Sequence, residues 1–75
     1  MRYIVLELQT SPDGSVAHIV DKYDDKNTAE SKFHSVLAYA SVSSLPSHGC
    51  MLLTSEGEML RSEVYHHEGV ENDDN

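Results

Sequence analysis

The sequence predicts a small α+β domain of two layers, in which an antiparallel four-stranded sheet carries one helix on one face in the order ββαββ. Three observations lead to this fold class. Apolar and polar residues alternate at period two towards both ends of the chain, apolar residues recur at helical spacing in the middle, and turn signals interrupt the alternation. At 75 residues the chain has room for one domain, which we place at residues 1–67.

The first two strands are expected at residues 2–9 and 15–23. Within 2–9, Ile4, Leu6 and Leu8 fall on one face at period two. Between the two segments, Pro12 presets a turn corner and Gly14 supplies a positive φ. The two segments are therefore predicted to form a β-hairpin.

A helix is expected from Asn27 to about Ser43. Glu30 follows Asn27 by three residues, which is typical of a capping box, and Pro46 marks the end of the helical segment. The residues predicted to face the core share one stripe at helical spacing: Ala29, Phe33, Val36, Leu37 and Ala40.

The second pair of strands is expected at residues 50–54 and 58–67, after a connection at 45–49 and with a turn at Gly57 between them. Both 2–9 and 50–54 carry apolar residues on both faces. Because one helix cannot cover both faces of a sheet, we expect a second copy of the chain or a partner to cover the other face. A homo-oligomer, and in particular a dimer, is favoured.

The expected interface combines apolar strand residues with tyrosines, which have an apolar ring and a polar tip. The alternative is that the tyrosines only rim the core. The candidate interface residues are Tyr3, Val5, Tyr39, Met51, Leu53 and Tyr65.

The charge of the chain narrows the choice of partner. Thirteen acidic against five basic residues give a formal net charge of −8, which argues against binding to a nucleic-acid backbone. Four of the acidic residues lie in 68–75, a segment with one apolar side chain that we predict to be a disordered acidic tail. Arg2, Lys22 and Arg61 lie on predicted strands and are candidates for contact with a small anion, since a local potential can oppose the net charge.

No residue pattern typical of catalysis is present. Cys50 opens an apolar strand, where a free thiol behaves as a small buried hydrophobe. The five histidines lack metal-ligand spacing, and there is neither a glycine-rich phosphate loop nor a Gly-x-Ser-x-Gly elbow. We therefore expect no enzyme activity, no metal and no cofactor.

The apolar run at residues 3–6 is too short for a signal peptide or a membrane span. This favours a cytoplasmic protein that does not associate with membranes.

Several segments resemble a family of very short proteins encoded by phages and prophages of Gram-positive gut bacteria. They are Tyr3-Ile-Val-Leu-Glu-Leu-Gln-Thr10, residues 23–34 with 36–37 and 42–46, then 52–57 and 65–68. The resemblance covers residues 3–68 and implies a phage context, in the cytoplasm of a bacterial host, without implying an activity. Small phage proteins without catalytic machinery often act by stoichiometric binding.

The expected function is therefore that of a non-enzymatic, oligomeric binding protein, in its sharpest form an antagonist of a host defence or regulatory protein. One alternative is a sponge for a small anionic ligand such as a cyclic nucleotide signal. Another is a minor virion or assembly component.

Overall fold

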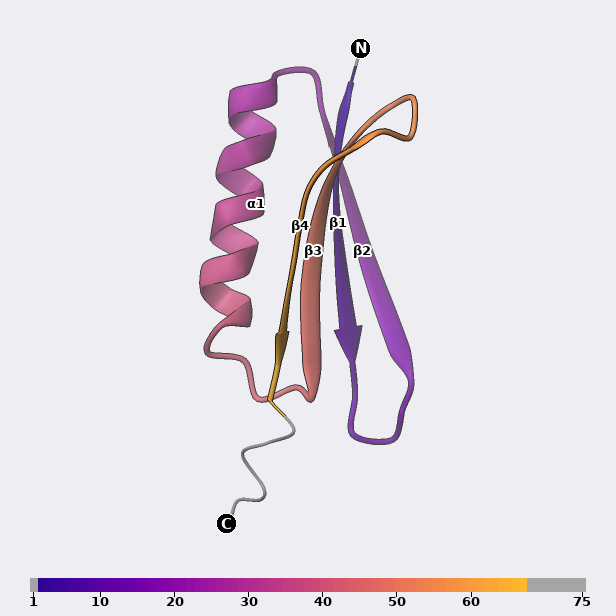
Figure 1. Ribbon diagram of the computed structural model, residues 1–75, viewed down its shortest axis with the longest axis vertical. Coiled ribbons are helices and arrows are strands. Elements are labelled where there is room, and N and C mark those ends of the chain that lie inside the picture. Colours follow the sequence, from indigo (N-terminus) through magenta and orange to yellow (C-terminus); the bar gives the residue numbers. More distant parts are fainter. Residues whose placement is uncertain (1, 68–75) are drawn as a thin grey trace.

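In the computed structural model, which describes residues 2–67, four strands form one antiparallel sheet and one helix packs against a single face of it (Figure 1). The α+β class and the order ββαββ predicted from the sequence are confirmed. The predicted acidic tail at 68–75 lies outside the described residues. The elements are β1 (Tyr3–Thr10), β2 (Val16–Tyr23), α1 (Lys26–Ala40), β3 (Ser47–Thr54) and β4 (Met59–His66).

The strands are arranged in the order β2-β1-β3-β4, so the two hairpins lie side by side through β1 and β3. Glycines with positive φ stand in both hairpin turns, Gly14 at 91° and Gly57 at 92°, as such turns require. In the sheet, Val5 lies opposite Leu52, and Leu6 lies opposite Met51. This register fixes which residues share a face.

The helix begins and ends earlier than the sequence pattern predicts. Its N-cap is Asp25 rather than Asn27, because the Asp25 carboxylate accepts a hydrogen bond from the backbone N–H of Thr28 at 2.8 Å. At the other end the helix stops at Ala40 instead of Ser43. The backbone N–H groups of Val42 and Ser43 each bond to the carbonyl three residues before, which is a tighter turn than that of an α-helix.

Strand β3 begins at Ser47, three residues before its predicted start, so the predicted connection at 45–49 is shorter than expected. Ser47 pairs with Thr10 on one side and with His66 on the other. The local sequence Pro-Ser-His-Gly is typical of a loop, but pairing with two neighbouring strands overrides this preference. As a result, His48 and Gly49 lie inside the sheet.

The core lies between α1 and the two central strands. Four of the five predicted stripe residues are buried, and the fifth, Leu37, packs against the core while partly buried. α1 lies over β1 and β3 more than over the edge strands. The buried apolar side chains are Val5, Ala29, Phe33, Val36, Ala40, Cys50 and Leu52.

Candidate functional site

The sheet face opposite α1 has no covering layer among the described residues, because α1 lies on one side of the sheet only (Figure 1). We call it the open face. The pairing register places four residues of each strand on it. They are Ile4, Leu6, Leu8 and Thr10 of β1; Val16, His18, Val20 and Lys22 of β2; Ser47, Gly49, Met51 and Leu53 of β3; and Met59, Ser62, Val64 and His66 of β4.

The open face is predominantly apolar. Nine of its sixteen side chains are aliphatic or methionine, and on the edge strands these are well exposed, for example Val16 at 61% and Met59 at 57%. No carboxylate occupies any of the sixteen positions, although residues 2–67 contain nine acidic residues. Among the sixteen open-face residues, only Lys22 has a side chain with a permanent charge.

A hollow of about 450 Å³ lies in the open face around Gly49. Apolar side chains that line it include Leu8, Met51 and Val64. A Cβ atom at position 49 would lie 3.3 Å from the Val64 Cγ2 atom and from the Glu63 carbonyl oxygen. Glycine has no Cβ atom, so it avoids this crowding and leaves a depression in the face.

The predicted interface residues do not share one face. Met51 and Leu53 lie on the open face, whereas Tyr3 and Val5 lie on the helix side. Val5 is 1% exposed beneath α1, so it is a core residue and is not available to an interface. Period two shows which residues of a strand share a face, but it does not show which face the helix will cover.

The two other tyrosines predicted at the interface also lie away from the open face. Tyr39 projects from α1 with 65% exposure. Tyr65 pairs with His48, which places it on the helix side of β4, where it is partly buried. Neither residue joins Met51 and Leu53 in one surface.

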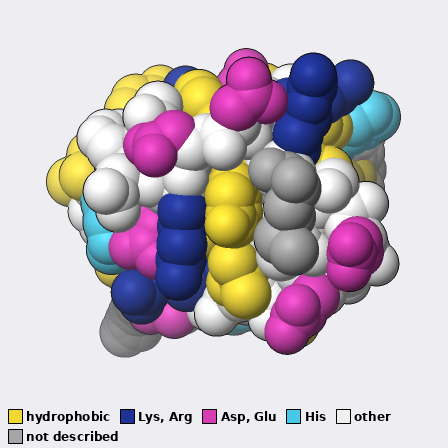
Figure 2. All heavy atoms as spheres, turned by 90° about the horizontal axis from the view of Figure 1, so that it is seen from above, with side chains coloured by type: hydrophobic (Ala, Val, Ile, Leu, Met, Phe, Trp, Pro, Cys, Tyr) yellow, Lys and Arg dark blue, Asp and Glu magenta, His cyan; other side chains and the backbone are white. Residues whose placement is uncertain are grey.

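The three candidate anion contacts are not brought together. The Arg2 Nε atom lies 3.2 Å from a carboxylate oxygen of Asp24, and the Arg61 Nε atom lies 3.5 Å from one of Glu30 on the helix side. Lys22 lies on the opposite, open face. On the end of the molecule seen in Figure 2, acidic and basic side chains are interspersed rather than gathered by sign.

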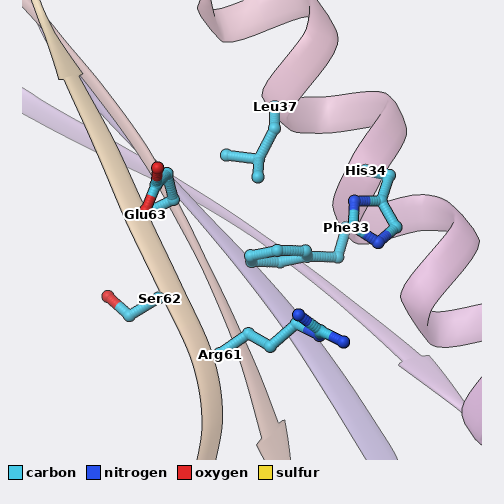
Figure 3. Close-up of a pocket in the computed structure, with 6 residues that line it drawn as sticks. All are labelled: Phe33, His34, Leu37, Arg61, Ser62 and Glu63. Carbon is cyan, nitrogen blue, oxygen red and sulfur yellow. The ribbon is translucent and has the colours of Figure 1, made fainter.

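A shallow groove of about 360 Å³ runs between α1 and β4 (Figure 3). Phe33 and Leu37 point from α1 towards the sheet, and Arg61 extends from β4 towards the helix. The groove marks the place where one helix fails to cover the edge strand. The Arg61 charge is paired with Glu30, and so the groove offers no unpaired cation from this residue.

A buried hydrogen-bonded pair, Glu7 and His48, which the sequence pattern did not reveal, links the central strands beneath α1. The His48 Nε2 atom lies 2.5 Å from a carboxylate oxygen of Glu7, and Gln9 donates to the same oxygen at 2.8 Å. His48 has no exposed surface, and the Tyr39 ring packs edge-on against it. The His48 Nδ1 atom is buried without a hydrogen-bond partner in the described part of the chain.

The surroundings of Glu7 favour its ionised form. Burial acts to raise the pKa of its carboxyl, but hydrogen bonds from Gln9 and His48 and the charges of His48 and Lys32 together hold that pKa below its usual value of 4.5. An ionised carboxylate only accepts hydrogen bonds, so the Nε2 atom of His48 donates. The pair is enclosed, and its role in the fold is to connect β1 and β3.

The lowered pKa of Glu7 predicts a loss of stability in acid. A folded-state pKa below the unfolded one stabilises the fold at neutral pH, and this contribution is lost as the pH falls below 4.5 and through the folded value. We expect the free energy of unfolding in urea at pH 7 to be lower for Glu7→Gln than for the wild type. The difference between the two free energies should become smaller in acid. Hydrogen bonds from Ser15 and Thr28 also lower the pKa values of Asp13 and Asp25, so only the comparison between the two proteins isolates Glu7. A difference that does not depend on pH would contradict this prediction.

Cys50 is buried next to this pair. Burial and the negative charge of Glu7 raise the pKa of its thiol to about 11, so the thiol is protonated at neutral pH. A protonated, buried thiol is a poor nucleophile.

Within residues 2–67, no group of three or more His, Cys, Asp or Glu side chains is arranged to hold a metal ion. No helix in this part of the chain is both long enough and apolar enough to cross a bilayer.

No protein-family model, no curated protein and no solved structure matches the chain. The fold and the site define it as a two-layer α+β domain with one open, apolar sheet face.

Proposed function

We propose that this chain is a non-enzymatic, homo-oligomeric binding protein, most simply a dimer, that acts by stoichiometric occupancy of a partner protein. The observation that carries the proposal is the open face. Four strands about 4.8 Å apart, each of eight residues rising about 3.4 Å, span roughly 500 Å². Nine of the sixteen open-face side chains are apolar, and the largest apolar patch on the surface of a soluble protein often serves an interaction.

The chemistry of the buried groups supports binding rather than catalysis. Glu7 and His48 are enclosed beneath α1 and hydrogen-bonded to each other. The Cys50 thiol is buried and protonated. A general base or a nucleophile must reach a substrate, and these groups do not.

The resemblance to short phage proteins suggests a host defence or regulatory protein as the partner. The net charge of −8 favours a partner with a basic surface, because complementary charge accelerates encounter. None of the sixteen open-face positions carries an acidic residue, so this partner is expected to meet another surface of the molecule.

Self-association is tested by light scattering coupled to size-exclusion chromatography. We expect a molar mass twice the 8.4 kDa of the monomer at protein concentrations of about 10–100 μM. A constant mass of 8.4 kDa over this range would contradict the oligomeric part of the proposal.

Occupancy of a partner is tested by affinity capture from the lysate of a Gram-positive gut bacterium. We expect one protein at near-stoichiometric yield, competed away by excess untagged chain. Recovery of no such protein would count against occupancy of a host protein and would leave the oligomeric state unaffected.

A further inference from the structure

We propose that two copies of the chain associate open face to open face, so that each copy supplies the layer that covers the other's sheet. The inference rests on the proposed self-association and names the surface that performs it.

The charges on the open face favour a second copy over a basic protein partner. A basic partner would be matched by an acidic surface, but none of the sixteen open-face positions carries a carboxylate. Two such faces bring no acidic groups together, although the chain carries a net charge of −8. The permanent charge of the face, on Lys22, lies at its corner on the edge strand β2. Little charge is therefore desolvated on association.

The area also fits a dimer. A face of roughly 500 Å² on each copy buries about 1,000 Å² in total, near the lower limit for a specific interface. The core of the described domain contains seven buried apolar side chains. So small a core provides only a few kcal/mol of stability. A covering layer adds to this stability, and it does so at all times only if it is always available. A second copy meets this condition, whereas a transient partner does not.

Association through the sheet edges is less suited to this chain. On edge strand β4, the pairing register with β3 shifts between Leu52 and Leu53, which indicates a β-bulge. Edge strand β2 carries the adjacent charged residues Asp21 and Lys22. Bulges and charges on edge strands oppose pairing with another sheet.

The hollow around Gly49 indicates how the strands of one copy are positioned over the strands of the other. Sheets that stack face to face keep their strands nearly aligned. A two-fold axis along the strands, between β1 and β3, sets β1 of each copy over β3 of the other. Leu8 and Gly49 are paired across these strands, so Leu8 of each copy enters the hollow of the other. Leu6 then lies over Met51 of the second copy, and Lys22 lies over its Met59 rather than over a like charge.

Two neighbouring residues of β2 provide a matched test. Val20 lies on the open face with 46% exposure, and Ile19 lies on the helix side with 45% exposure. We expect Val20→Asp to raise the dissociation constant of the dimer at least about tenfold, because it buries an unpaired carboxylate in the interface. We expect Ile19→Asp to change that constant by less than about threefold. Sedimentation velocity over a dilution series measures both, and far-UV circular dichroism checks that both variants are folded.

A second variant keeps the test informative if Val20→Asp does not fold. Leu8→Ala removes apolar atoms from the interface without adding a charge, and its control is Val42→Ala at a 79% exposed position beyond α1. Weaker association of Leu8→Ala alone supports the inference. A wild-type monomer would overturn both this inference and the proposed self-association. A wild-type dimer that neither Val20→Asp nor Leu8→Ala weakens would overturn the face-to-face inference only.

Discussion

Leu52→Ala is expected to abolish cooperative folding or to lower the melting temperature by roughly 20 °C. Leu52 has no exposed surface and lies in β3 beneath α1, among the core residues that include Val5 and Phe33. Truncating a fully buried leucine costs about 2–5 kcal/mol, which is comparable with the whole stability of so small a domain. Thermal unfolding followed by circular dichroism measures the effect.

The neighbouring residue provides the control for this prediction. Leu53 is partly buried on the open face, so Leu53→Ala removes the same atoms outside the core. We expect a smaller loss that shrinks on dilution, because in the proposed dimer Leu53 contributes through the second copy, which dissociates at low concentration. Equal losses for the two variants, both independent of concentration, would show that the core does not lie where the structure places it.

His48→Ala is expected to destabilise the domain by about 3 kcal/mol at neutral pH, because it removes a hydrogen bond to a buried carboxylate. The substitution leaves the Glu7 carboxylate buried, with Gln9 as its only remaining side-chain hydrogen-bond partner in the described chain, and it opens a space beside Tyr39. Removing the donor costs more than the hydrogen bond itself contributes, because the buried carboxylate of Glu7 loses a partner that water does not replace. Urea unfolding at pH 7 measures the loss.

Two further variants separate the pair from general packing. His34 is exposed on α1, and we expect His34→Ala to leave stability nearly unchanged. The double variant Glu7→Leu with His48→Leu removes the carboxylate together with its partner, and we expect it to be more stable than His48→Ala. If the double variant were the less stable of the two, the loss in His48→Ala would not come from the unpaired carboxylate.

The fold was predictable because its signals are local. Alternation at period two defined the strands, the stripe from Ala29 to Ala40 defined the helix, and Gly14 and Gly57 marked the turns. The boundaries were less predictable where tertiary pairing decides them. Ser47 joins β3 because Thr10 and His66 lie on either side of it, and no local pattern shows this.

The site was predictable only in part, for a related reason. Two apolar faces on β1 and β3 indicated that one helix would leave a face uncovered, but the choice between Val5 and Leu6 as the core-facing residue depends on how the helix docks. The Glu7–His48 pair joins residues 41 positions apart, and His48 lies in a segment with loop-like composition. The polar residue on the Tyr3–Val5–Glu7 face was the only sequence signal, and it did not identify its partner.

The open face and the acidic residues elsewhere suggest two separate binding surfaces. In this account the carboxylate-free face joins two copies, and the acidic surfaces are left for a partner protein. In this account the open face is covered by a second copy of the chain, and the acidic charge elsewhere attracts the partner protein.

The most direct test of the face-to-face dimer is an isotope-filtered NMR experiment on a mixed dimer of labelled and unlabelled chains. The account predicts intermolecular contacts between the methyl groups of Leu6 or Leu8 in one copy and Met51 in the other. Intermolecular contacts confined to the β2 or β4 edges, or to the surface of α1, would contradict it.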